Sequence, residues 1–236
     1  MNELIHNIKR AHNFAFRHLI YPVLLSTFLV FFFFFGRIYL IGQVGYLSLI
    51  WNLFLAWLPY IFVLITSLIH ELKPRWWLMI VPAGLWLLFL PNAFYIVTDF
   101  MQLTEHPSIP IWYDAGLITI TSWTGLFLAI ISLFTMQRIV QKHLGDLFSW
   151  GFAILIIGLN GYGVYLGRFL RWNSWDIFFE PFGILSDSYD LLVNPLDSKE
   201  VIGFIAMYTS LFLVTYLTFS LLLLSKERVD RRKGQE

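Results

Sequence analysis

The sequence contains no cysteine, and only 13% of its 236 residues are charged. The lack of cysteine excludes thiol nucleophiles, thioester intermediates, disulfides and cysteine-based metal sites. The formal net charge of +1 excludes a strongly basic nucleic-acid-binding surface, so we expect no nucleic-acid partner. Soluble domains carry about 25% charged residues, so the scarcity of charge also points away from a soluble globular protein.

Hydrophobic residues instead make up 58% of the chain and aromatic residues 19%. A transmembrane helix needs about 20 mainly apolar residues, and continuous rather than alternating apolar runs exclude a barrel. Six runs meet this requirement, at about residues 19–40, 46–69, 76–98, 111–136, 147–169 and 201–224. The sequence therefore predicts an all-α fold, a polytopic bundle of six transmembrane helices in one membrane domain over residues 1–236.

Basic residues favour one side of the predicted membrane domain. With alternating helices, one side receives Lys9, Arg10, Arg17, Lys73, Arg75, Arg138, Lys142, Lys226, Arg228, Arg231, Arg232 and Lys233. The other side carries most of the acids and the long connection at about residues 172–200, which we expect to form an outer cap. The positive-inside rule then predicts that the N-terminus and the C-terminus are both cytoplasmic. The segment at residues 2–18 is expected to be an amphipathic helix on the inner leaflet.

Polar residues that are costly in lipid gather on the predicted outer side. The third run ends in LPNAFYIVTD (residues 90–99), where Asn92, Tyr95 and Asp99 have i, i+3, i+7 spacing and would share a helical face. At the same predicted depth lie Arg37, Asn52, Tyr113, Asp114, Arg168, Arg171, Asn173 and Asp176. Asn160 lies deeper, in the middle of the fifth run, and should be hydrogen-bonded to a neighbouring helix. Gly163 and Gly167 form a GxxxG pattern that permits close helix approach.

Four strings carry a resemblance to a known family. They are WNLFLAW (residues 51–57), LPNAFYIVTD (90–99), WYD (112–114) and GRFLRWNSWD (167–176). Together they resemble the membrane family called domain of unknown function 1361, and the resemblance covers nearly the whole chain from the second run to the sixth. It implies a prokaryotic multi-pass protein of the cell membrane. It implies no reaction, so no catalytic roles are transferred.

The polar cluster has two interpretations. In the structural one, Arg168 and Arg171 pair with Asp99, Asp114 or Asp176 and pin helices together. In the functional one, the arginines, aspartates, asparagines and tyrosines form a binding site under the aromatic cap. Because guanidinium groups suit phosphates and carboxylates, that site would take an anionic amphiphile or the headgroup of an envelope lipid.

Catalysis is a further hypothesis for the same residues. Asp99 or Asp114 would act as a general base, and Arg168 or Arg171 would stabilise an anionic transition state. A Ser-His-Asp triad is disfavoured because His106 is the only histidine expected on the outer side. Asp99, Asp114, Asp176, Glu180 and His106 match no familiar metal motif, so no metal is expected. No nucleotide-type glycine loop is found outside the apolar runs, and we expect no cofactor.

Three classes of function remain open. The first is an amphiphile-binding protein whose partners are membrane lipids, with or without chemical modification of the bound lipid. The second is a small transporter or a membrane subunit of one, although such proteins place polar residues near the midplane and only Asn160 lies there. The third is a structural or assembly partner in a membrane complex. Neither a homo-oligomer nor a membrane-protein partner is excluded by the sequence.

Overall fold

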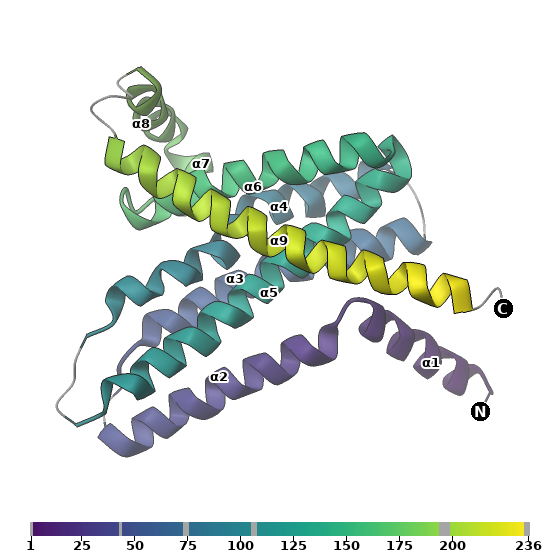
Figure 1. The fold of residues 1–236 in the computed structure, drawn as a ribbon, viewed down its shortest axis with the longest axis horizontal. Helices are drawn as coiled ribbons and strands as arrows, with labels where there is room; N and C mark the ends of the chain where they lie inside the picture. Colours follow the sequence, from purple (N-terminus) through teal and green to yellow (C-terminus); the bar gives the residue numbers. More distant parts are fainter. Residues whose placement is uncertain (1, 43, 73–75, 105–107, 194–198, 234–236) are drawn as a thin grey trace. The chain divides into compact units, whose positions relative to one another are not determined.

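The computed structural model describes residues 2–42, 44–72, 76–104, 108–193 and 199–233. The chain divides into two compact units, Met1–Thr135 and Met136–Glu236. Its helices are labelled along the ribbon in Figure 1. Six described helical segments are long and apolar enough to cross a membrane: Ile20–Ile41, Leu47–Leu72, Trp76–Gln102, Ile111–Leu144, Asp146–Arg168 and Lys199–Leu224. This confirms the predicted all-α fold with six membrane-spanning helices.

The first unit is built from helices at the start of the chain. Its elements are α1 (Asn2–Arg17), α2 (Ile20–Ile41), α3 (Leu47–Leu72), α4 (Trp76–Tyr95), the 3₁₀ helix η1 (Ile96–Gln102) and most of α5 (Ile111–Leu144). Leu19, with φ of 57°, separates the amphipathic α1 from α2, and Gly42, with φ of 72°, ends α2. Both lie in the left-handed region, where the chain leaves helical geometry.

Two spans differ from the sequence-based bounds. The third continues beyond residue 98 as η1 and ends at Gln102. The fourth continues to Leu144 instead of ending near residue 136, because α5 runs without a break into its basic last turn, at Lys142 and His143. Cationic residues at a helix C-terminus interact favourably with the helix dipole.

The interior of the first unit is formed by α3, α4 and the part of α5 that belongs to this unit. Tyr60 of α3 and Trp86 of α4 are among the largest fully buried side chains. The Trp86 indole donates a hydrogen bond of 3.3 Å to the Ser132 hydroxyl and so joins α4 to α5. At Gly125 of α5 an added Cβ would meet the Ile96 side chain at 2.2 Å, so this glycine is required for α5 to approach η1.

The second unit contains the end of α5, α6 (Asp146–Arg168), α7 (Asp176–Phe179), α8 (Pro181–Val193) and α9 (Lys199–Lys233). Helices α6 and α9 approach closely at Gly161, where an added Cβ would meet the Thr209 hydroxyl at 1.9 Å and the Ile205 carbonyl at 3.3 Å. This close approach is at Gly161, two residues before Gly163, and the close approach predicted for Gly163 and Gly167 stays a prediction.

Asn160 is buried in α6, as expected, but its predicted hydrogen bond to another helix is wrong. The side-chain amide donates a hydrogen bond of 2.7 Å to the Ile156 backbone carbonyl of its own helix. Among the residues described, the Asn160 Oδ1 and the Thr209 hydroxyl are buried without a hydrogen-bond partner. The amide group turns back onto α6 because the carbonyl four residues earlier is within reach.

The connection expected at residues 172–200 is mostly helical, since it contains α7 and α8. Two side-chain bonds attach α8 to the rest of the second unit: Tyr162 with Ser188 at 2.5 Å, and the Trp172 indole donating to Asp187 at 2.8 Å. Gly183 gives Trp172 room, since a Cβ there would lie 2.8 Å from the indole ring. The predicted cap over the whole bundle and the single membrane domain both stay predictions.

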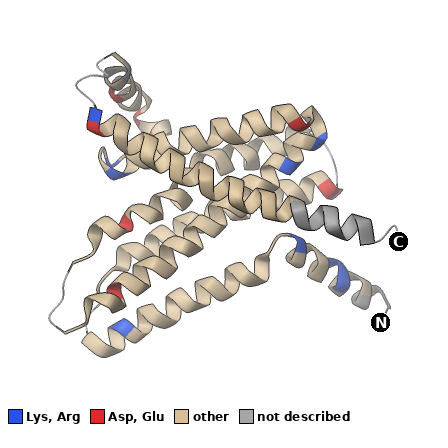
Figure 2. Cartoon of the chain, viewed as in Figure 1, with Lys and Arg blue, Asp and Glu red and all other residues tan. Residues whose placement is uncertain are grey.

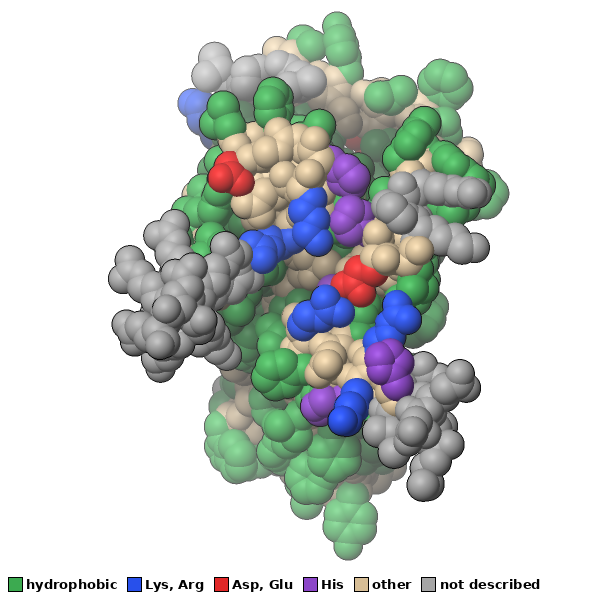
Figure 3. Space-filling view, turned by 90° about the vertical axis from the view of Figure 1, so that its right-hand side faces the viewer, with side chains coloured by type: hydrophobic (Ala, Val, Ile, Leu, Met, Phe, Trp, Pro, Cys, Tyr) green, Lys and Arg blue, Asp and Glu red, His purple; other side chains and the backbone are tan. Residues whose placement is uncertain are grey.

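Charged residues are sparse in the described part of the chain. Most of each span is drawn in the colour of uncharged residues in Figure 2. Lys, Arg and His side chains are visible among hydrophobic ones in Figure 3. Several residues used for the orientation argument lie outside the described residues: Lys73 and Arg75, and the side chains of residues 225–236. The orientation of the termini therefore stays a prediction.

Candidate functional site

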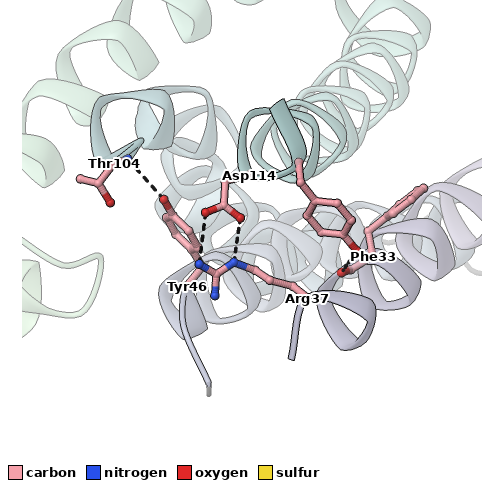
Figure 4. A network of polar contacts seen from close by, with 6 residues as sticks. Phe33, Arg37, Tyr46, Thr104 and Asp114 are labelled. Carbon is pink, nitrogen blue, oxygen red and sulfur yellow. Dashed lines mark hydrogen bonds and ion pairs between the residues drawn. The ribbon is translucent and has the colours of Figure 1, made fainter. Parts of the chain in front are cut away.

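A buried ion pair joins the end of α2 to the start of α5. The Arg37 Nε donates to Asp114 Oδ1 at 2.7 Å, and Nη2 donates to Oδ2 at 3.1 Å (Figure 4). Both side chains are almost fully enclosed, with relative exposures of 6% and 2%. A two-point contact of this kind fixes both position and orientation of the two groups. The structure thus shows a guanidinium partner for Asp114 that belongs to α2.

The connection between α2 and α3 encloses the arginine. The Tyr46 ring lies 4.6 Å from the Arg37 Cζ, a cation–π contact. A Cβ on Gly45 would meet Arg37 Nη1 at 2.5 Å, so any other residue here would force the guanidinium to shift. The Tyr46 hydroxyl accepts a hydrogen bond of 3.4 Å from the Thr104 backbone (Figure 4). The ion pair is therefore enclosed by residues of the α2–α3 connection, and Thr104 of the η1–α5 connection holds Tyr46 in place.

Tyr113 makes a second link between the same two helices. Its hydroxyl donates a hydrogen bond of 2.9 Å to the Phe33 carbonyl. A Cβ on Gly36 would lie 2.7 Å from that hydroxyl. Tyr113 and Asp114 are adjacent in sequence and both bind α2. Their geometry fits the structural interpretation, in which polar groups hold helices together.

Asp99 lies in a separate cluster between η1 and α3. It is fully buried, and its two carboxylate oxygens accept hydrogen bonds from the Asn52 amide at 2.9 Å and the Gln102 amide at 3.1 Å. The Ser48 hydroxyl donates a hydrogen bond of 3.3 Å to the side-chain oxygen Oε1 of Gln102. Asn52 and Asp99, both predicted site residues, are thus brought together, and Gln102 and Ser48 join them.

The chain leaves α-helical geometry inside the segment on which Asn92, Tyr95 and Asp99 were expected to share a face, and that shared face stays a prediction. That expectation assumes an α-helix through residue 99, whereas the chain becomes a 3₁₀ helix at Ile96. A 3₁₀ helix has three residues per turn, so Asp99 is rotated away from its α-helical direction. Asn92 donates 3.1 Å to the Phe89 carbonyl, on the helix carrying Pro91.

The second unit carries the other predicted residues. Asp176, at the start of α7, accepts hydrogen bonds from the Asn173 backbone at 2.6 Å and from the Asn173 side chain at 3.1 Å. The pair therefore closes the turn before α7. Arg168 ends α6 and is partly buried. Whether these residues and those of the first unit form one site stays a prediction.

Arg171 differs from the other charged residues of the candidate site. Its backbone has φ of 60°, in the left-handed region that glycine and asparagine favour. This conformation turns the chain after α6, so that the Trp172 backbone donates 3.1 Å to the Leu166 carbonyl. The arginine side chain is exposed and has no hydrogen bond or ion pair with any residue that the structure describes.

A third polar cluster lies at the other end of the first unit. Arg17 pairs with Glu71 at 3.1 Å. The buried His18 lies between α1 and α2, with its ring nitrogen Nε2 3.3 Å from the Ser67 hydroxyl. Its backbone carbonyl accepts a hydrogen bond of 2.8 Å from the Tyr60 hydroxyl. Burial lowers the pKa of His18 below its ordinary value of 6.5; Glu71 raises it and Arg17 lowers it. No pattern in the sequence distinguishes this buried histidine from the other histidines near span ends.

The contacts limit what chemistry the predicted catalytic residues can perform. Asp114 has both oxygens bound by Arg37, and Asp99 has both oxygens bound by amides. Such carboxylates are well placed to orient their partners. No group of three or more potential metal-ligating side chains occurs among the residues that the structure describes, and His106 lies outside them.

A comparison with known protein families identifies the family whose members this chain resembles along its length. The family described as "Protein of unknown function (DUF1361)" matches residues 51–215, which is more than half of the chain. The chain belongs to this family. No curated protein matches the chain, and no solved structure does.

The DUF1361 region contains Asn52, Asp99, Asp114 and Arg171, whereas Arg37 lies outside it. The partner of Asp114 is thus contributed by the segment before the matched region. The sequence did signal Arg37, as a charge inside an apolar run, but offered three aspartates and three arginines with no means of pairing them. Gln102 gave only the weak signal of a polar residue near a span end.

Proposed function

We propose that this integral membrane protein binds the headgroup of an anionic amphiphile, through Arg171 on the outer-leaflet side of a prokaryotic cell membrane. The observation that supports the proposal is the state of Arg171: exposed, in a left-handed backbone conformation, and unpaired within the described part of the chain. The other contacts made by the candidate residues are internal hydrogen bonds and ion pairs. Arg171 therefore offers a binding group to an outside partner.

The backbone conformation strengthens this argument. A non-glycine residue in the left-handed region costs about 1 kcal/mol relative to glycine, and such strain concentrates at functional sites. Glycine at position 171 would make the same turn without that cost. We infer that arginine is found here because its side chain binds a molecule other than the protein itself.

The surroundings of Arg171 suit a lipid headgroup. Phe169 and Leu170 precede it and are exposed, as are Phe178, Phe179 and Phe182 on α7 and α8. Aromatic rings favour the interface between lipid and water, where headgroups lie. Two carboxylates of the same connection are hydrogen-bonded within the protein, Asp176 to Asn173 and Asp187 to Trp172. A guanidinium group binds phosphate with two parallel hydrogen bonds.

The proposal is tested with the full chain reconstituted in phosphatidylcholine vesicles. Electron spin resonance of spin-labelled lipids measures whether the protein surface prefers phosphatidylglycerol over phosphatidylcholine. We expect a preference for phosphatidylglycerol that Arg171→Gln reduces about tenfold at that site, as loss of a charge-assisted contact implies. Arg171→Lys should keep part of the preference, since it retains the charge without the planar fork.

Two variants separate binding from folding. Arg171→Gly should lose the preference while raising the thermal unfolding temperature, because it removes the left-handed strain. Lys142→Gln removes an exposed cation at the end of α5 and should leave the preference intact. Equal affinity for both lipids in the native protein, or an unchanged preference in Arg171→Gln, contradicts the proposal.

A structural role is the better account of Arg37 and Asp114. The pair is buried, two-pronged and enclosed by Tyr46 and Gly45, so its groups are fully used within the protein. We infer that it holds α2 against α5 in the first unit. Catalytic modification of the amphiphile and transport have no comparable support in these contacts.

A further inference from the structure

A different surface, in the first unit, presents oxygen acceptors instead of a cation. Asn52, Ser48 and Gln102 surround the buried Asp99 and are each at least partly exposed. This cluster is independent of Arg171 and is not needed for the function proposed above. Its hydrogen-bond directions define the kind of group that it can take.

Asp99 sets the orientation of both amides. The Asn52 amide nitrogen donates to one carboxylate oxygen and the Gln102 amide nitrogen to the other, at 2.9 and 3.1 Å. A carboxylate that accepts on both oxygens requires donors, so each planar amide must turn its NH₂ group toward Asp99. The carbonyl oxygens are then directed away from Asp99. Asp99 is therefore a positioning residue for the two outward oxygens.

One of these oxygens is unoccupied within the described structure. The Asn52 Oδ1 has no hydrogen bond to any residue that the structure describes, whereas Gln102 Oε1 accepts one from Ser48. A carbonyl oxygen accepts two hydrogen bonds, so Gln102 keeps capacity as well. Acceptors outnumber free donors on this surface. It is suited to a partner that donates several hydrogen bonds.

The charge around this cluster and its depth in the membrane restrict further the kind of group that it can bind. The Asp99 carboxylate lies directly behind the amides and favours positive charge, and within this unit the guanidinium of Arg37 is engaged by Asp114. Asn52 is the sixth residue of α3, so it lies about 8 Å from the helix start, near headgroup depth. Trp51 beside it is exposed and stacks near Phe54, as aromatic residues at the interface do.

We propose that Asn52, Gln102 and Ser48 form a binding site for a primary ammonium headgroup, that of an ethanolamine phospholipid. An ammonium group carries three N–H donors and a positive charge, and it matches the outward acceptors and the Asp99 carboxylate. The trimethylated headgroup of phosphatidylcholine has the same charge and phosphate but no donor. The two lipids therefore differ only in the feature that this site recognises.

Native mass spectrometry of the full chain tests the proposal. The protein is released from micelles holding equal amounts of phosphatidylethanolamine and phosphatidylcholine of identical acyl chains, and the lipids retained are counted. We expect an excess of phosphatidylethanolamine of about tenfold, the factor of one charge-assisted hydrogen bond. Asn52→Leu and Asp99→Asn should each bring the ratio close to one, and Ser48→Ala should lower it in part.

The variants separate this site from folding and from the Arg171 site. Ser48 is exposed, so Ser48→Ala leaves the fold intact even if Asp99→Asn does not. Gln141→Leu removes an exposed amide elsewhere and should keep the native ratio. Arg171→Gln should also keep it, so failure of either proposal is recognised without the other. Equal retention of the two lipids, or a native ratio in both Asn52→Leu and Ser48→Ala, overturns the ammonium site.

Discussion

Individual charged residues of this protein serve two different purposes. Arg37 and Asp114 satisfy one another in the interior of the first unit, whereas Arg171 is held at the surface in a strained conformation. Taking charges out of water is expensive, and a buried ion pair recovers that free energy only with good geometry. The two-point contact meets this condition. Residue type alone does not separate the two roles, since both involve an arginine near the end of a span.

The ion pair leads to a prediction about unfolding. Arg37→Leu leaves the buried Asp114 carboxylate without its guanidinium and should lower the free energy of unfolding by about 3–5 kcal/mol. The double variant Arg37→Leu, Asp114→Leu removes both charges and should recover most of that loss. Thermal unfolding in detergent measures both. A double variant no more stable than Arg37→Leu alone contradicts the structural role of the pair.

His18 predicts how stability depends on pH. Burial lowers its pKa below 6.5, so the unfolded chain binds a proton more readily than the folded one. Stability should therefore rise with pH up to about 6.5 and fall below it, by the linkage between proton binding and folding. Glu71 and Arg17 act on the pKa of His18 in opposite directions, and burial remains the largest cause of its shift.

The measurement is the unfolding temperature in detergent at about pH 7.5 and about pH 5.5. His18→Gln should reduce the difference between the two values, because the group that titrates is gone. His12 is exposed and bonded to the Tyr21 hydroxyl, so His12→Gln serves as the matched control and should keep the native difference. If His18→Gln retains the full pH dependence, the burial of His18 does not carry it.

At the scale of helices, local backbone detail decided which sequence-based expectations failed. The apolar runs predicted every span, because length and composition are enough to identify them. The change to a 3₁₀ helix at Ile96, between Tyr95 and Asp99, was not predicted, since no sequence signal marks it. The glycine contact at Gly161 also depends on which face α9 presents, and spacing within α6 does not reveal that.

The close approach of α6 and α9 predicts a strong effect of one methyl group. Gly161→Ala places a Cβ at 1.9 Å from the Thr209 hydroxyl and should destabilise the second unit by about 1–3 kcal/mol. Gly158→Ala, where nothing lies within 4 Å of the added atom, is the control and should be neutral or slightly stabilising.

Thr209→Ala removes the hydroxyl that the new methyl group meets, so the pair Gly161→Ala, Thr209→Ala should be more stable than Gly161→Ala alone. Thermal unfolding of the full chain in detergent compares the variants. An unaltered unfolding temperature in Gly161→Ala shows that the two helices do not approach at this position.

For the whole molecule, the sequence predicted the fold class and only part of the candidate site. Asn52 and Asp99 were expected near one another and are joined by a hydrogen bond. Asn173 and Asp176 were both expected in the site and instead bind one another at the start of α7. The pairing of Asp114 was beyond the sequence, because several arginines share the predicted depth and only three-dimensional packing selects Arg37.

The absence of cysteine makes the predicted orientation easy to test. Single cysteines at two exposed positions, Lys142→Cys in the last turn of the fourth span and Ser186→Cys on α8, should react from opposite sides of the membrane. Basic residues on the N-terminal side predict that the α8 cysteine reacts with an impermeant maleimide in intact cells and that the Lys142→Cys protein reacts only after lysis. The reverse pattern contradicts the cytoplasmic termini.

The central claim is that Arg171 and its neighbours meet an anionic headgroup. The most direct measurement is photo-crosslinking of the full chain with phosphatidylglycerol that carries a photoreactive group on its headgroup, followed by peptide mapping. The account predicts crosslinks within residues 169–182, and their loss in Arg171→Gln. Crosslinks spread evenly over the spans, or concentrated near Lys142 and unaffected by Arg171→Gln, contradict it.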